Sequence, residues 1–279
     1  MATINLATKF LPLVDEKFTT ESKKSMLTNT DFDWTGAHSV KVYKVSVSGM
    51  NDYDRNAVNK ENWSRFGAIE GLDAVTEEMM LKKDRSFTFA IDKLDTDETN
   101  QQLQAASALE RQMREVVIPE VDQYTYGIMC ENAGNKPAAV ELTAENICDE
   151  IFKGNAVLDN AEVPETNRVL VVTPDTYLLM KQSKDINLHT DIAQEMRLKG
   201  VIAMLDGAQV VKVPANRLPE KFGFMIAHPV ATVAPTKLED YRVHTDPPGI
   251  SGSLVEGRIC YDAFVLDNKK SAIYYQAKA

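Results

Sequence analysis

Metal-binding side chains are sparse in this chain of 279 residues, and their spacing does not form a local site. A zinc site built within one short motif needs histidine or cysteine ligands a few residues apart. None of the four histidines, His38, His189, His228 and His244, lies three to five residues from another histidine or a cysteine. We therefore interpret the histidines as solvated or as satisfied within the core, and predict no metal ligand. A site assembled across the fold remains the alternative.

The three cysteines, Cys130, Cys148 and Cys260, could in principle supply a nucleophile or a disulfide. Their odd number and wide spacing favour reduced thiols in a cytosolic setting over a disulfide framework. The sequence also lacks the Gly-x-Ser-x-Gly pattern of a nucleophilic serine turn. We interpret all three cysteines as small hydrophobic residues and predict no catalytic residue.

Two short segments come near to ligand-binding motifs without completing them. Asp95-Thr96-Asp97-Glu98 resembles half of a calcium loop, but the glycine at position six and the closing glutamate are missing. We expect these acids at the start of the long helix, where the helix dipole favours negative charge. Gly249-Ile250-Ser251-Gly252 lacks the further glycine and the lysine of a phosphate loop. The sequence therefore predicts no cofactor and no cofactor-binding residue.

The bulk composition limits the classes of partner. A net charge of -10 and a pI of about 5.0 make the chain a poor candidate for gripping nucleic acid by phosphate neutralisation. It could still enclose DNA without gripping it. No apolar stretch approaches the length of a membrane span, and no signal peptide is visible at the start. Hydrophobic residues make up 44% of the chain, which allows one large domain or two modest ones.

The strongest expected element is a long helix over residues 98–130. Its apolar residues recur at spacings of three or four, as one face of a helix requires: Leu103, Ala106, Leu109, Met113, Val117, Val121, Tyr124 and Ile128. Pro119 falls within the pattern. Because its ring removes a backbone donor and clashes one turn back, we expect it to kink or interrupt the helix.

Residues 36–95 are expected to form a projecting β-arm. Residues 40–47 are rich in β-branched side chains, and residues 86–93 alternate apolar with polar, so both are predicted strands. Almost forty polar residues separate them, which favours a long two-stranded ribbon with a mobile tip. An isolated ribbon is marginal in water, so its apolar face needs a cover, and we expect an adjacent copy to supply it. A β-subdomain folded back on its own core is the alternative.

The rest of the chain mixes helices and strands. Expected helices begin at Thr143 as N-cap and cover 175–181 and 190–199. Expected strands are 169–172, 201–205 and 209–213 around an Asp206-Gly207 turn, 222–227, and 254–266 with a break at Gly257-Arg258; 267–270 is a turn and 271–275 pairs back. Residues 1–35 are polar, and we interpret them either as a frayed terminus or as an arm ordered on a neighbouring subunit. The fold class is α+β.

Several stretches carry a resemblance to a known family. They are 6–10, 33–36, 50–53, 84–92 and above all 257–270, Gly-Arg-Ile-Cys-Tyr-Asp-Ala-Phe-Val-Leu-Asp-Asn-Lys-Lys. The order of elements agrees with them: polar N-terminal arm, β-arm, long helix, mixed region and closing strands. The chain resembles the major capsid proteins of tailed bacteriophages, which share the Hong Kong ninety-seven coat fold with the encapsulins.

The resemblance implies a phage major capsid protein fold with five regions. They are an N-terminal arm (1–35), an extended β-arm or E-loop (36–95), a peripheral domain with the spine helix (96–166), an axial domain (167–235), and return strands of the peripheral domain (236–279). The implied function is structural and non-catalytic: self-assembly into the icosahedral shell that encloses phage DNA.

The resemblance also implies the partners and the location. Identical subunits would assemble as pentamers and hexamers in the host bacterial cytoplasm and become part of the virion, with no membrane contact. A separate scaffolding protein, a portal and double-stranded DNA held without sequence-specific contact are the other expected partners. Two alternatives stay open: an encapsulin-like nanocompartment shell, and a soluble enzyme whose site is dispersed in sequence.

Overall fold

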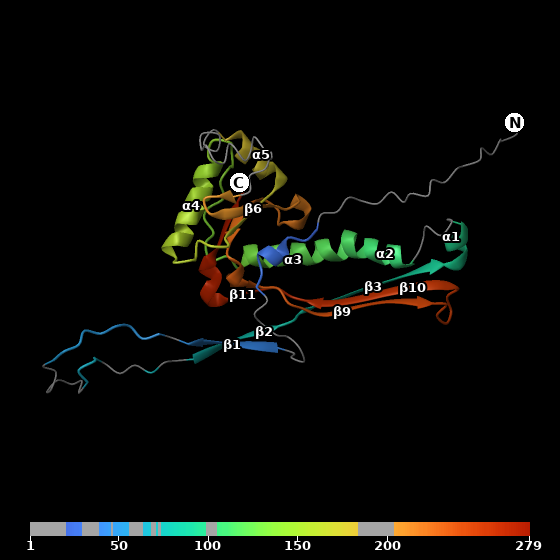
Figure 1. Cartoon of the computed structure of the whole chain (residues 1–279), viewed down its shortest axis with the longest axis horizontal. Helices are drawn as coiled ribbons and strands as arrows, with labels where there is room; N and C mark the ends of the chain where they lie inside the picture. The colour runs from blue at the N-terminus through green and yellow to red at the C-terminus, as the bar shows by residue number, and fades with distance from the viewer. Residues whose placement is uncertain are drawn as a thin grey trace. The chain divides into compact units, whose positions relative to one another are not determined.

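The computed structural model describes residues 21–29, 39–45, 47–55, 64–67, 71, 74–98, 105–183 and 204–279 (Figure 1). The chain divides into two compact units. One is the arm unit, Trp34–Leu81. The other, the main unit, combines Met1–Asp33 with Lys82–Ala279. The helix expected at 190–199 and the first twenty residues lie outside the described part of the chain.

The described part of the arm unit is built on two antiparallel strands, β1 (Ser39–Val45) and β2 (Ala74–Met80). Their register runs from Ser39 opposite Met80 to Val45 opposite Ala74. The predicted strand at 40–47 is thus confirmed as β1. The sequence pattern missed β2, because Ala-Val-Thr-Glu-Glu-Met-Met neither alternates nor is rich in β-branched residues.

The strand pairing expected within 36–95 is wrong. The predicted strand at 86–93 exists as β3 (Lys83–Asp92), but β3 pairs with β10 (Gly252–Tyr261) in the main unit and not with β1. The reason is burial: β3 alternates around Phe87, Phe89 and Ile91, and such a face is stable only where a helix or sheet covers it.

A three-stranded antiparallel sheet forms one layer of the main unit, in the order β3-β10-β9. The sequence missed β9 (Thr236–Thr245), four of whose ten residues are charged. The expected break at Gly257-Arg258 is wrong, since β10 continues through it. A Cβ at position 257 would lie 2.3 Å from the Phe87 ring. Glycine there lets Phe87 stack with Tyr241 across β10, with ring centroids 6.2 Å apart.

Helices run along this sheet (Figure 1). In chain order they are α1 (Lys93–Glu98), α2 (Ala105–Gln112), the π-helical turn η2 (Met113–Val117) and α3 (Ile118–Glu131). The interruption predicted at Pro119 takes the form of the π turn. Its wider winding accommodates a ring that would otherwise clash with the carbonyl one turn back. Val117 and Val121 are buried as predicted, whereas Ala106 is exposed.

Helix α3 and the three-stranded sheet share a small apolar core. Val117 and Val121 pack there against Ile259 and Tyr261. By contrast, α2 contributes no buried side chain. The helix layer is therefore held to the sheet mainly at its α3 end.

A five-stranded mixed sheet, ordered β12-β7-β4-β6-β5, forms the second part of the main unit. The predicted central strand is confirmed as β4 (Val169–Val172), which runs parallel to β6 (Ala208–Lys212) and antiparallel to β7 (Phe222–Ala227). Asp206 and Gly207, both at positive φ, make the predicted hairpin from β5 (Met204–Leu205) to β6. Helices α4 (Ile147–Asn160) and α5 (Pro174–Gln182) belong to this part.

Two boundary predictions in this region need correction. Regular helix α4 begins at Ile147 and not directly after Thr143, and Asn146 is its N-cap. The Asn146 side chain accepts a hydrogen bond from the Thr143 N–H at 2.8 Å, so a turn precedes the helix. In α5, Thr173 does act as a cap, accepting from the Thr176 N–H.

The closing strand also pairs differently from the prediction. β12 (Ile273–Ala277) follows the 3-10 helix η5 (Asp267–Ala272) and pairs with β7, not with the strand before it. The short strand β11 (Phe264–Val265) pairs with β8 (Thr232–Val233). The remaining 3-10 turns are η1 (Lys24–Met26), η3 (Ala215–Arg217) and η4 (Pro229–Ala231).

Candidate assembly interface

The side chains that could carry chemistry are dispersed over the main unit. Within the described residues, no group of three or more histidine, cysteine, aspartate or glutamate side chains is placed to hold a metal. Cys130 and Cys148 are buried. Burial raises the pKa of the Cys130 thiol to about 12, which keeps it protonated and weakly nucleophilic. The described helices include none that could cross a membrane.

The two histidines that the structure describes each contact a neighbouring backbone or side-chain group. His228 precedes η4 and accepts a hydrogen bond from the Val230 N–H through Nδ1, while burial lowers its pKa. His244 lies on β9 with its Nε2 3.4 Å from a Glu256 carboxylate oxygen. His38 and His189 lie outside the described residues.

The two near-motifs also have local structural roles. Asp95 lies in the first turn of the short helix α1, but Glu98 is the last residue of that helix, so the acidic stretch is not confined to a helix start as predicted. Gly249, at positive φ, belongs to the turn between β9 and β10, and Gly252 begins β10.

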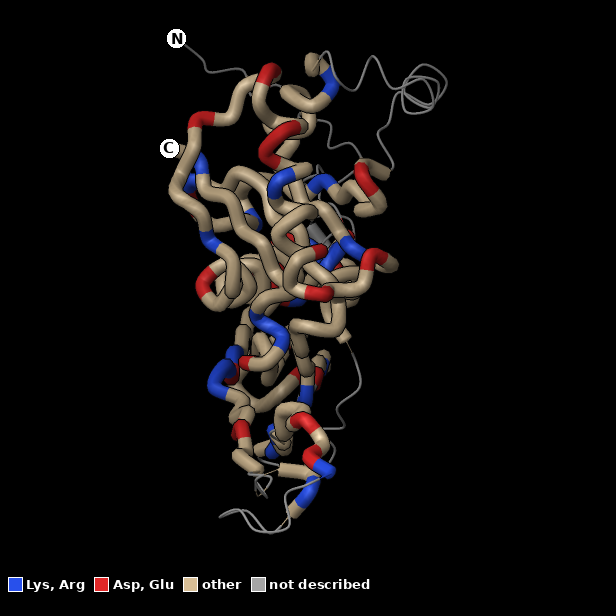
Figure 2. Tube along the Cα trace, turned by 90° about the vertical axis from the view of Figure 1, so that its left-hand side faces the viewer, with Lys and Arg blue, Asp and Glu red and all other residues tan. Residues whose placement is uncertain are grey.

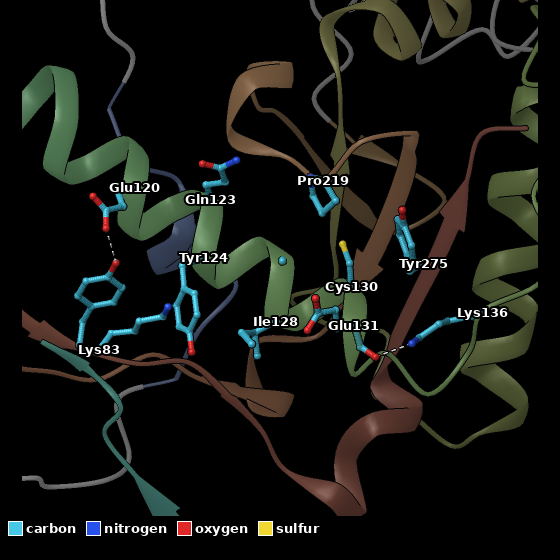
Figure 3. A pocket seen from close by; sticks show the side chains of 12 residues that line it. Lys83, Glu120, Gln123, Tyr124, Ile128, Cys130, Glu131, Lys136, Pro219 and Tyr275 are labelled. Carbon is cyan, nitrogen blue, oxygen red and sulfur yellow. Dashed lines mark hydrogen bonds between the residues drawn. The ribbon is translucent and has the colours of Figure 1, made fainter. Parts of the chain in front are cut away.

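A surface hollow of about 680 Å³ lies beside α3 (Figure 3). Its wall combines three tyrosines, Tyr124, Tyr261 and Tyr275, with charged side chains from several elements. Those charged groups have partners: the Lys83 ammonium lies 4.9 Å from the centre of the Tyr124 ring, and Glu120 binds Arg85 at 2.7 Å. The hollow is therefore an amphipathic surface whose polar groups cross-link the helix to the sheet.

Asp262 anchors the point at which the chain enters the main unit from the arm. It is buried, and one carboxylate oxygen accepts from the backbone N–H of Lys82 at 2.8 Å. Its other oxygen accepts from the Tyr124 hydroxyl at 2.7 Å and from the Ala263 N–H. Burial and this contact raise the pKa of Tyr124. The first residue after the arm unit is thus tied to α3 and to the end of β10.

Apolar side chains are concentrated in the arm unit without being covered. Among the described residues, fourteen large hydrophobic side chains are exposed, and eight of them lie within Trp34–Leu81, less than a fifth of the chain. These eight are Tyr43, Val45, Val47, Met50, Tyr53, Phe66, Val75 and Met80. We call them the arm patch. A concentration of this kind on a water-soluble surface marks an interaction site.

The arm patch occupies both faces of the ribbon. Directly opposed residues of an antiparallel pair point to the same face. Tyr43, Val45 and Met80 therefore share one face, and Val75 lies on the other. The sequence predicted a single apolar face, but the ribbon has two partly apolar faces. Each face could contact a different neighbouring molecule.

The arm nevertheless has internal contacts that define its shape. Lys44 and Glu77 form an ion pair at 3.1 Å across the two strands. Beyond the strands, the Asp54 N–H donates to the Arg65 carbonyl at 3.0 Å. Tyr53 and Phe66 meet edge to face, with ring centroids 5.0 Å apart. The ribbon is therefore continued toward its tip by contacts between its two limbs.

The charges of the described residues do not form a nucleic-acid clamp. Figure 2 shows lysine and arginine interspersed with aspartate and glutamate along the trace. On the outer face of the three-stranded sheet the charges pair directly: Arg258 binds Asp84 at 2.5 Å and Arg242 binds Asp240 at 2.7 Å. Binding by phosphate neutralisation depends on lysine and arginine that are not already paired with carboxylates, so this face is a poor candidate for it.

No family model and no curated protein match this sequence. Solved structures do match. A chain of Mycobacterium phage Che8 has a TM-score of 0.81 at 16% identity, covering 98% of this chain and 97% of that chain. A chain from the capsid of cyanophage P-SCSP1u has a TM-score of 0.77 at 13% identity, covering 99% and 93%.

A third similar structure comes from outside the phages. A virus-like particle from Pyrococcus furiosus has a TM-score of 0.57 at 11% identity, with 92% of both chains covered. The likenesses extend over nearly the whole chain, arm unit included. This chain therefore has the α+β fold of phage capsid chains, which confirms the fold predicted from its sequence.

Proposed function

We propose that this chain is a major capsid protein, a non-catalytic subunit whose identical copies assemble into an icosahedral shell around phage DNA. The fold shared with phage capsid chains supports the proposal. The observation that carries it is the arm patch, because eight exposed apolar side chains on a ribbon need a cover that the described part of the chain does not provide. A neighbouring copy would supply that cover.

Assembly through such arms is a matter of many modest contacts. A subunit that reaches one neighbour and receives the arm of another makes a head-to-tail contact, which generates rings when the rotation closes. Once a ring has formed, the contacts stabilise one another, because each is then made within one assembly at a high effective concentration. Pentamers and hexamers of the subunit follow as the natural closed units.

The regional assignment belongs to the same proposal. We assign 1–35 to an N-terminal arm, 36–95 to the E-loop, 96–166 to the peripheral domain, 167–235 to the axial domain and 236–279 to return strands. Within the region 36–95, β3 belongs to the main unit and pairs with β10. Strands β9 and β10 from the last region complete the sheet under the spine helix. Strand β12 from the same region adds to the sheet that we assign to the axial domain.

The acidic character of the chain fits a container for DNA. A subunit with a net charge of -10 would hold packaged DNA loosely, since it releases few counterions from the phosphates. Mutual repulsion would also keep free subunits soluble in the bacterial cytoplasm before they assemble. A separate scaffolding protein and a portal would start and regulate assembly.

The test of the proposal is electron microscopy of the purified protein with two matched variants. We expect closed shells from the native chain and few or none from the double variant Tyr43→Ser and Val45→Ser, which removes two members of the arm patch. Thr76→Ser, opposite Tyr43 on the same face, keeps the polarity and should leave the shells intact. Soluble monomers from the native chain, with or without a scaffolding partner, would contradict the proposal.

The likeness to the Pyrococcus furiosus particle favours one second candidate, an encapsulin-like compartment. Both candidates predict the same shell and differ in its contents. Particles isolated from the native host would contain double-stranded DNA if the chain is a capsid protein. An enclosed enzyme without DNA would favour the compartment.

A further inference from the structure

The segment 21–29, which we call the N-terminal strap, is fixed on its own chain. Its turn η1 leads to Leu27, which is fully buried in the main core. At its far end, the Asn29 N–H donates to the Thr232 carbonyl at 2.9 Å, and the Asn29 side-chain amide donates to the Val230 carbonyl at 3.1 Å. The strap therefore has a buried anchor and a hydrogen-bonded end at strand β8.

The first part of the strap is held by a buried carboxylate on α3. Asp122 has only 1% of its side chain exposed. Its Oδ1 accepts from the Ser22 hydroxyl at 2.5 Å, and its Oδ2 accepts from Arg217 Nη1 at 2.9 Å. Arg217 is itself buried and belongs to η3, which joins β6 to β7 of the five-stranded sheet. One carboxylate thus receives donors from the strap and from the five-stranded sheet.

The surrounding charges tighten this junction. Burial lowers the pKa of Lys24 in the strap, while the negative charges of Asp122 and of Glu239 on β9 oppose that change. A buried ion pair is stable only when its remaining lone pairs and protons are satisfied. Withdrawing the strap would remove the Ser22 donor and open the space that Leu27 fills, so the pairing of α3 with η3 would lose support.

We propose that the strap is a lock on the junction between the helix layer and the five-stranded sheet, with Asp122 as its latch. While Ser22 and Leu27 are seated, α3 and η3 are held in one arrangement. When the strap leaves, the two parts of the main unit gain freedom to change their angle. If the chain is a capsid subunit, as proposed above, the lock would fix the shape of each subunit. It would thereby set the curvature of the shell that neighbouring copies form.

Hydrogen exchange of the full-length chain tests the lock itself. Ser22→Ala removes the latch contact, and Leu27→Ala removes the buried anchor. We expect the exchange rates of the Asn29 and Arg217 backbone N–H groups to rise about tenfold in Leu27→Ala and several-fold in Ser22→Ala. The exchange rates in α4 should not change. Ser25→Ala, an exposed neighbour in the strap, is the matched control and should change nothing. Because Ser22→Ala leaves the core filled, it keeps the test informative if Leu27→Ala fails to fold.

Two results would overturn the lock. One is faster exchange at Asn29 with no change at Arg217, since the strap would then be independent of the junction. The other is unchanged exchange at both amides in Ser22→Ala. Trypsin gives a second readout, because cleavage after Lys23 and Lys24 should accelerate in Ser22→Ala and not in Ser25→Ala.

The shell readout separates the lock from the proposed function. Particles of Ser22→Ala should vary more in diameter than particles of Ser25→Ala under the electron microscope. Uniform particles together with raised exchange at Arg217 would overturn the curvature role. Absence of particles from the native chain would overturn the proposed function, while the exchange result would still decide whether the lock exists.

Discussion

The five-stranded sheet and the arm ribbon are both β-structure, yet they bury their residues in opposite ways. Every residue of β4 and β7 is buried. In β1 and β2, by contrast, Met79 is the one buried residue. β4 and β7 each lie between two other strands, whereas among the described strands β1 and β2 pair only with each other. The described part of the ribbon therefore lacks both a third strand and the packed layer that two strands need in water.

The two units differ in whether they bury their own apolar residues. The main unit buries its apolar residues within one chain, as a self-sufficient domain does. The arm unit holds its shape through ion pairs and edge contacts but leaves the arm patch bare. Changes in the main unit should therefore affect folding, and changes in the arm should affect assembly.

The largest expected effect is on assembly. Deleting Asn51–Gly71 should leave the subunit soluble and folded but unable to form closed shells, because the deletion removes the reach of the arm and not the core. Electron microscopy of the purified variant checks the shells, and circular dichroism checks the fold. Normal-sized particles from the deletion variant would show that assembly does not depend on the arm unit.

The next effect is on folding. Val117→Asp should lower the free energy of unfolding by about 3–5 kcal/mol, because it places an unpaired charge in the core between α3 and the three-stranded sheet. Val116, next to it, is 45% exposed. Val116→Asp is therefore the matched control, with an expected change below about 1 kcal/mol. Urea unfolding followed by circular dichroism measures both, and equal stabilities would argue against the helix assignment.

A smaller effect distinguishes two glycines. Gly257→Ala should cost about 1–3 kcal/mol, because the added Cβ would meet the Phe87 ring at 2.3 Å in the packed sheet. Gly49 in the arm unit has no neighbour within 4 Å of an added Cβ. Gly49→Ala should therefore leave the unfolding midpoint nearly unchanged. A similar loss at both positions would show that the arm is packed more tightly than its exposure indicates.

The smallest expected effect concerns alkaline pH. The pKa of Cys130 is raised by burial to about 12, from an ordinary value of 9.0. The unfolded chain therefore loses this proton first, and the contribution of the neutral thiol is complete below pH 9 and is lost as pH rises toward 12. Cys130→Ala should flatten the decline in stability over that interval. An unchanged slope in urea unfolding at pH 8, 9 and 10 would contradict the assignment.

Local patterns were sufficient wherever neighbouring residues in sequence decide the structure. The run Val169–Val172 and the Asp206-Gly207 turn both behave as their residue types predict. The spacing of Val117 and Val121 correctly indicated a buried helix face. Pro119 was correctly identified as an irregularity, although the π turn that accommodates it was not.

Local sequence patterns could not predict which residues far apart in the chain contact one another. β3 was expected to pair with β1 and pairs with β10, more than 150 residues away in the chain. The lock at Asp122 was also missed, because Ser22, Asp122 and Arg217 are isolated polar residues in sequence and no spacing connects them. A polar residue within an apolar helix pattern, such as Asp122, was the one available signal.

The sequence by itself determined the acidic charge, many of the helical and extended segments although not β2 and β9, and the resemblance to phage coat proteins. These depend on residue type and on periods of two or 3.6 residues, which are local. The tertiary structure alone decided the long-range strand pairs, where the arm unit ends, and that a buried carboxylate joins the N-terminal strap to α3 and η3. Such contacts depend on burial and on distances in space, and a linear pattern does not encode either.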